Sequence, residues 1–283
     1  MGEHLAPGKL VLLGEYAVLD GAPAVVCAVD RGVRCVLTPS ERREHITPGD
    51  DRFVAAALDA CDAPAGTYTF STWNPVDAET KVGFGHSAAA TVAALHAAGL
   101  RGDELLARAL AVHHQVQGSG SGVDVAASAV GGVLRFQAGA ASPLPAIEPI
   151  VVWSGASALT GPRVSAYSAW ADERARAAFV DRSTAVVEAM ASDPIAALRE
   201  ARSLLAQMSL AAGVAWDTPA LHHLGDLAEQ LGGAAKPSGA GGGDCLVALF
   251  PDDERARDYV DRVRAEGFTV IPTRLAPGVR RVE

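Results

Sequence analysis

The chain has 283 residues, 49% of them hydrophobic and 20% charged, so it can bury a sizeable core as one large domain or two lobes. Its formal net charge of −9 argues against a general polyanion binder such as a nucleic-acid protein. An anionic substrate would therefore need a local positive pocket.

The cysteines and the N-terminus indicate a reducing compartment. The four cysteines are scattered and show no CxxC spacing: Cys27, Cys35, Cys61 and Cys245. The first residues lack the apolar run of a signal peptide, and no stretch reaches the roughly 18 apolar residues of a membrane span. We expect a cytoplasmic monomer or homodimer with no membrane or nucleic-acid partner.

The first half of the chain mixes strands and helices without strict βαβ alternation, which favours α+β packing. Residues 9–18 predict a buried strand that turns at Gly14 and continues as strand. Further strands are expected over 24–37, 67–73 and 133–136, and helices over 51–61, 86–98, 102–116 and 123–130. Asp103 is the expected N-cap of the helix that starts near residue 102.

The second half is expected to form its own lobe. Residues 138–149 are rich in Pro, Ala and Ser, which places the lobe boundary between 1–145 and 146–283. Strands are expected over 150–153, 245–250 and 268–275, and helices over 166–191, 194–212, 219–231 and 252–266.

Residues 81–95, KVGFGHSAAATVAAL, predict a phosphate-binding loop. Gly83 and Gly85 precede a predicted helix, and glycines let backbone N–H groups approach an anion closely. The helix start adds unpaired N–H groups and the positive end of the dipole. Lys81 could reach a phosphate, and the Ser87 hydroxyl could bind a phosphate or Mg²⁺.

Each of these features also has a structural explanation. The glycines could simply cap the helix, and the Walker pattern GxxxxGK[ST] is absent. Lys81 could be a solvated lysine, and His86 could cap the loop, contact phosphate or pack. The functional interpretation depends on the features that accompany this loop elsewhere.

Only three lysines occur in the chain, Lys9, Lys81 and Lys236, and each lies in one of the unusual segments. Lys9 is the first residue of a predicted buried strand, where its charge must face a cleft or find a partner. Taken alone it could also be a surface lysine at a strand start. The placement of all three favours an anion site in a protein of net charge −9.

Two further flexible segments complete the set. GSGSGVDVAAS (118–128) places Asp124 at the start of a short apolar helix. There it could be an N-cap, or a carboxylate aimed into a cleft beside Lys9 that orients or deprotonates an attacking oxygen. KPSGAGGGDCLVALF (236–250) contains only Gly, Ala and Ser from 238 to 243, which suits close backbone approach to a ligand.

These segments, in this order, resemble the GHMP kinase superfamily over residues 6–250. APGKLVLLGEYAVLDG is similar to its first motif, GFGHSAAA to its phosphate-binding motif, and SGAGGGD to its C-terminal glycine motif. Within the superfamily, QGSGSGVDVAAS, VVWSGASALT and TPALHHLGDLAEQLGGAAKPSGAGGGDC most resemble the phosphomevalonate kinase family.

The resemblance implies an α+β protein with a ribosomal protein S5 domain 2-like N-terminal lobe, a ferredoxin-like C-terminal lobe, and ATP and substrate in the cleft between them. It implies ATP- and Mg²⁺-dependent phosphorylation of a phosphorylated small molecule, 5-phosphomevalonate, in isoprenoid precursor synthesis. Lys9 and Asp124 would be catalytic. ATP phosphates would be bound by Lys81, Gly83, Gly85, His86, Ser87 and Ala88, with the metal at Ser87. The substrate would be bound by Tyr16, Ser121, Gly122, Lys236, Ser238, Gly239, Ala240 and Gly241.

Two positions depart from the family pattern. The phosphate loop usually reads GLGSSA, and His86 stands for its first serine. Mevalonate kinases place a Mg²⁺-binding glutamate about eleven residues before the aspartate, which here is His113, so Mg²⁺ is expected on Ser87, phosphates and water. The alternatives are mevalonate kinase or another GHMP small-molecule kinase, and a non-catalytic GHMP-fold metabolite-binding protein.

Overall fold

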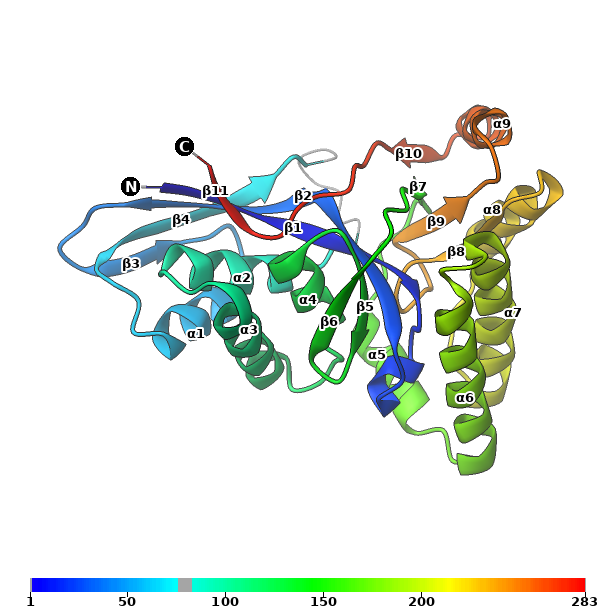
Figure 1. Cartoon of the computed structure of the whole chain (residues 1–283), viewed down its shortest axis with the longest axis horizontal. Helices are drawn as coiled ribbons and strands as arrows, with labels where there is room; N and C mark the ends of the chain where they lie inside the picture. The colour runs from blue at the N-terminus through cyan, green and yellow to red at the C-terminus, as the bar shows by residue number, and fades with distance from the viewer. Residues whose placement is uncertain (1, 76–82, 283) are drawn as a thin grey trace.

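The larger of two sheets organises the first lobe (Figure 1). The computed structural model describes residues 2–75 and 83–282. The sheet has the order β11-β1-β2-β4-β3, and β5 and β6 extend it from β2. Its strands are β1 (Gly2–Leu13), β2 (Ala24–Thr38), β3 (Arg43–Ile46), β4 (Gly66–Trp73), β5 (Val133–Gln137), β6 (Ala140–Leu144) and β11 (Arg280–Val282). All pairs are antiparallel except β3–β4.

Strand β1 positions Lys9. Its register against β2 shifts between Pro7 and Gly8, directly before Lys9. Such an irregularity bends a strand and re-aims the next side chain. A Cβ at Gly8 would lie 2.6 Å from Phe84 O, so only glycine lets the segment around Phe84 approach so closely.

Four helices cover one face of this sheet: α1 (Arg52–Ala60), α2 (His86–Ala97), α3 (Gly102–Gln117) and α4 (Val123–Val130) (Figure 1). Helix α2 is buried from Ala88 to Ala97 apart from Ala90, because its small alanines allow close approach of sheet and neighbouring helices. The predicted phosphate loop is thus attached to a helix that the core holds on nearly all sides.

The second lobe packs helices on a four-stranded antiparallel sheet of order β10-β7-β9-β8. Its elements are β7 (Ile150–Trp153), α5 (Thr160–Ser168), α6 (Glu173–Ala189), α7 (Pro194–Ala212), α8 (Pro219–Gln230), β8 (Ala234–Pro237), β9 (Cys245–Leu249), α9 (Asp253–Ala265) and β10 (Thr269–Ile271). The predicted α+β fold with two lobes is confirmed. None of the helices in the described ranges combines the length and apolar character needed to cross a bilayer.

The structure corrects several sequence-based predictions. The chain after Gly14 forms a short 3-10 helix, η1 (Ala17–Asp20), instead of more strand, because Gly14 and Tyr16 take positive φ angles of 90° and 65°. Residue 101 caps α3 in place of Asp103. The expected helix over 166–191 is broken between α5 and α6.

Strands β3, β6, β8 and β11 were not predicted. They are only three to five residues long, so their own residues carry little signal. Strand β11 returns to pair with β1, which places both ends of the described chain in the first lobe (Figure 1). The division at residue 145 falls in the link between β6 and β7 but leaves this return out.

A buried histidine pair joins β1 to the end of α2. The Nδ1 atoms of His4 and His96 lie 2.7 Å apart, so one donates to the other. Burial, together with the nearby positive charge of Arg101, lowers the pKa of both imidazoles to about 4. Arg281 adds positive charge beside His4. Both rings are therefore neutral at neutral pH.

This pair predicts a loss of stability in mild acid. Histidines in the unfolded chain bind protons below about pH 6.5, whereas the folded pair excludes them until about pH 4. The free energy of unfolding should fall by about 3 kcal/mol for each histidine that gains a proton as pH drops across that window. Urea unfolding at a series of pH values measures it. A His4→Gln/His96→Gln variant should show a shallower slope, and an unchanged slope would contradict the assignment.

Candidate active site

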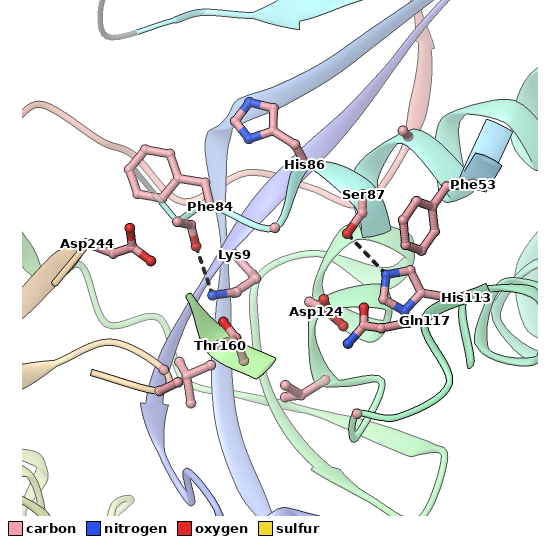
Figure 2. Close-up of a pocket in the computed structure, with 18 of the residues that line it drawn as sticks. Lys9, Phe53, Phe84, His86, Ser87, His113, Gln117, Asp124, Thr160 and Asp244 are labelled. Carbon is pink, nitrogen blue, oxygen red and sulfur yellow. Dashed lines mark hydrogen bonds between the residues drawn. The ribbon is translucent and has the colours of Figure 1, made fainter. Parts of the chain in front are cut away.

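A cleft of about 1070 Å³ contains most of the predicted site residues (Figure 2). It is lined by β1 and the turn after it, β4, the loop before α2, the end of α3 with the start of α4, the segment before α5, and the second glycine loop. Pockets for one drug-sized ligand occupy roughly 300–1,000 Å³, so this cleft has room for a nucleotide and a small acceptor side by side.

The start of α2 forms an anion cradle. Gly83 and Gly85 have φ angles of 77° and 74°, which favour glycine. Gly85 is the N-cap, makes no side-chain cap, and accepts the N–H of Ala89 at 3.1 Å. A helix start leaves its first N–H groups without intrahelical carbonyl partners and carries the positive end of the helix dipole, and in α2 Ser87 and Ala88 lie in this first turn. Phosphate binds well at such a helix start.

Lys9 lies against this cradle. Its Nζ donates to Gly83 O at 2.9 Å, and its backbone N donates to Phe84 O at 3.0 Å. A Cβ built on Gly85 would lie 3.2 Å from Lys9 Cγ and 3.5 Å from Asp124 Cβ. One on Gly239 would lie 3.7 Å from Lys9 Nζ. The lysine, the aspartate and both glycine loops therefore meet at one place, as Figure 2 shows for Lys9 and Asp124.

Asp124 is not the cap of its helix. The N-cap of α4 is Gly122, at φ 81°, and Asp124 lies in the first turn. Its Oδ1 accepts the Val125 N–H at 2.9 Å, and in the described ranges this is its only hydrogen bond. Its carboxylate faces the cleft beside Lys9 without a direct ion pair to it (Figure 2). It can therefore contact a ligand between them.

The second glycine loop belongs to the second lobe but is held by the first. Ser238 Oγ accepts the Val11 N–H at 2.9 Å, and the Tyr16 hydroxyl donates to Ala240 O at 2.5 Å. Burial raises the pKa of Tyr16, so its phenol keeps the proton that it donates. These contacts fix the loop over the same cleft that the cradle faces.

Lys236 is placed differently from the prediction. Its side chain is 0% exposed, does not line the cleft, and forms an ion pair with Glu15, which is only 4% exposed. Burial lowers the pKa of the ammonium, and the Glu15 carboxylate opposes that effect. Glu15 Oε1 also accepts the Gly239 N–H at 3.3 Å. Lys236 thus supports the loop from behind instead of contacting substrate directly.

Most of the other predicted residues line the cleft: Lys9, Tyr16, Gly83, Gly85, His86, Ser87, Ser121, Gly122, Asp124, Ser238, Gly239 and Ala240. Ala88 is fully buried, so it can offer only its backbone N–H. Gly241 packs on Trp216, where a Cβ would lie 2.3 Å from the carbonyl oxygen. Lys81 lies outside the described residues.

Two cleft residues were missed as site candidates, Glu15 and Asp244. Asp244 has a φ angle of 56°, and its Oδ1 accepts the Ala158 N–H at 3.1 Å. Burial raises its pKa, and Lys9 and Arg163 oppose that effect. The side chains of Glu15 and Lys236 are both buried and each needs a partner of opposite charge, but they lie far apart in the sequence and no local pattern pairs them.

The comparisons with known proteins agree with this geometry. The GHMP kinase N-terminal domain model matches residues 53–132, and the GHMP kinase C-terminal model matches residues 187–268. Phosphomevalonate kinase of Streptomyces sp. (strain CL190) is 30% identical, with 98% of this chain and 97% of the relative covered.

Solved structures show the same fold. A Lin0012 protein from Listeria innocua superposes with a TM-score of 0.90 at 25% identity, covering 99% of both chains. Streptococcus pneumoniae phosphomevalonate kinase, solved with phosphomevalonate and AMPPNP, superposes with a TM-score of 0.80 at 20% identity, covering 98% of this chain and all of the other.

Two lobes with a phosphate cradle and a facing glycine loop define an ATP-binding small-molecule kinase. The chain belongs to the GHMP kinase family.

Proposed function

We propose that this chain transfers the γ-phosphoryl group of ATP to the phosphate of 5-phosphomevalonate, giving 5-diphosphomevalonate and ADP. The observation that carries the proposal is the meeting of Lys9, Asp124 and both glycine loops in one cleft. The full-length similarity to a phosphomevalonate kinase supports this acceptor within the family. We also infer a cytoplasmic setting.

The charge around the second glycine loop favours an anionic acceptor. The Arg163 guanidinium donates to three carbonyl oxygens, those of Ala215 at 2.7 Å, Leu159 at 2.8 Å and Gly242 at 3.4 Å. Among the described residues no carboxylate forms an ion pair with it. Burial raises the pKa of Tyr16 and of Asp244, and the nearby positive charge of Arg163 opposes both rises. This uncompensated cation would attract a phosphate-bearing substrate to that side of the cleft.

Phosphoryl transfer asks mainly for alignment and for neutralised charge. The α2 N-terminus would bind the ATP phosphates, and the Lys9 ammonium would offset negative charge on the transferring group. A phosphate acceptor is already ionised near neutral pH, so Asp124 is proposed to orient Lys9 and the acceptor instead of acting as a strong base. The Tyr16 hydroxyl and the Lys236–Glu15 pair hold the second loop in place.

The donor atoms at the cradle fit a divalent cation. The Ser87 hydroxyl and the Asp124 carboxylate are oxygen ligands of the kind that Mg²⁺ accepts beside nucleotide phosphates. When bound there, Mg²⁺ would neutralise charge on the β- and γ-phosphates. No cluster of three or more His, Cys, Asp or Glu side chains suited to a metal occurs in residues 2–75 and 83–282. Phosphate oxygens and water would therefore supply further ligands.

A coupled ADP-release assay over several acceptors tests the proposal. We expect 5-phosphomevalonate to exceed mevalonate, galactose and homoserine in kcat/KM by about a hundredfold or more, since the site must neutralise the extra phosphate. Mevalonate as the better acceptor would assign the mevalonate kinase reaction instead. Binding of AMPPNP without ADP release from any acceptor would overturn the catalytic proposal.

A further inference from the structure

An imidazole lies beside the hydroxyl at the cradle. Ser87 is the second residue of α2, and its Oγ lies 3.2 Å from Nε2 of His113, which is near the end of α3. His113 lines the cleft although only 4% of its surface is exposed. Its ring packs on Phe53 with centroids 5.0 Å apart and planes 31° apart. Packing therefore fixes which way the nitrogen points (Figure 2).

The separation of these two atoms suits joint metal ligation. Two ligands at right angles in an octahedral site, with bonds of about 2.1 Å, lie about 3 Å from each other. Ser87 Oγ and His113 Nε2 are 3.2 Å apart, so a single ion could accept both with little movement. The contact would otherwise be an ordinary hydrogen bond that only orients the hydroxyl.

Further donors face the same place. The Asp124 carboxylate and the Gln117 side-chain amide lie next to His113 in Figure 2, and both residues line the cleft. Gln117 is one helical turn beyond His113, so the two side chains share a face of α3. The donor set at the cradle thus combines oxygen atoms with one imidazole nitrogen.

We propose that His113 Nε2 and Ser87 Oγ together bind the divalent cation that accompanies the nucleotide, and that this site prefers Mn²⁺ or Co²⁺ to Mg²⁺. Imidazole nitrogen suits transition-metal ions, whereas Mg²⁺ selects oxygen ligands in strict octahedral geometry. The inference rests on nucleotide binding by the proposed kinase, but it is independent of the identity of the acceptor.

Electron spin-echo spectroscopy of the full chain with Mn²⁺ and AMPPNP tests the ligand directly. We expect modulation from a directly bound ¹⁴N nucleus that changes when the protein is grown with ¹⁵N-histidine, a comparison that needs no variant. His113→Gln should abolish the coupling, whereas His114→Gln, at the exposed next position of α3, should retain it. Coupling that is absent from the natural chain, or that persists in His113→Gln, would overturn the proposal.

Metal preference supplies a second readout. AMPPNP binding is measured by calorimetry with Mg²⁺, Mn²⁺ or Co²⁺, and the ratio of dissociation constants gives the preference. His113→Glu, which replaces nitrogen with a carboxylate, should shift the Co²⁺-to-Mg²⁺ preference by about tenfold toward Mg²⁺. An unchanged ratio would contradict nitrogen ligation. No acceptor is present in either experiment, so a wrong acceptor assignment leaves both results interpretable.

Discussion

The Lys9→Met variant is expected to turn over about a hundredfold to a thousandfold more slowly than the natural chain. Removing one preorganised electrostatic donor costs roughly 2.7–4 kcal/mol of barrier in comparable sites. The Lys9 ammonium is the cleft cation that lies between the cradle carbonyl of Gly83 and the second glycine loop. Because methionine keeps much of the volume, the loss should appear in kcat with 5-phosphomevalonate, measured by ADP release.

Urea unfolding and AMPPNP binding show whether the Lys9→Met protein is still folded and still binds nucleotide. In the described part of the chain the Lys9 side chain makes one hydrogen bond, to Gly83 O, so the urea midpoint should move little compared with the change in kcat. AMPPNP binding should also persist, since the α2 N-terminus stays intact. Near-normal turnover in a folded Lys9→Met protein would remove Lys9 from the mechanism.

Replacing Lys236 by methionine is expected to lower the free energy of unfolding by about 3–5 kcal/mol. Lys236 and Glu15 form an ion pair at 0% and 3% side-chain exposure, and removing one partner leaves the other charge buried and uncompensated. Glu15 Oε2 is already without a hydrogen-bond partner among the described residues, so the carboxylate has little other support. Urea unfolding measures the effect.

Two further variants isolate the cause. A Glu15→Gln/Lys236→Met protein should recover much of the lost stability, because no unpaired charge remains. Arg262→Met breaks the exposed pair with Asp258, 52% and 44% exposed, and should change stability by less than about 1 kcal/mol. Equal effects of Lys236→Met and Arg262→Met would show that burial of the ion pair does not matter.

Much of the cleft could be predicted because its parts carry local signals. Positive φ angles at Gly83, Gly85 and Gly122 match glycines that the sequence already singled out. The helix predicted over 86–98 is present as α2, and its alanines allow it to pack closely behind the phosphate loop. Lys9 was identifiable because a charge on a buried strand must have a partner or a cleft.

Other features depended on contacts that no local pattern encodes. The short strand β11 forms only because it pairs with β1 from the far end of the chain, and β3 pairs with β4 across the whole of α1. The turn after Gly14 continues as η1 because Tyr16 reaches across to Ala240 while its ring packs near Tyr167. Secondary-structure prediction from a short window of sequence cannot include Ala240 and Tyr167, which lie far from Tyr16 in the chain.

The sequence by itself determined the types of local structure and the functional groups available to the site. These are glycine loops before helices, three lysines in unusual segments, and a carboxylate after a flexible turn. Only the tertiary structure decided which of these groups meet. Lys236 lies next to Glu15, 221 positions away, and His113 next to Ser87, 26 positions away. Backbone conformation follows mainly from neighbours in sequence, whereas burial and side-chain pairing follow from packing between elements that the sequence separates.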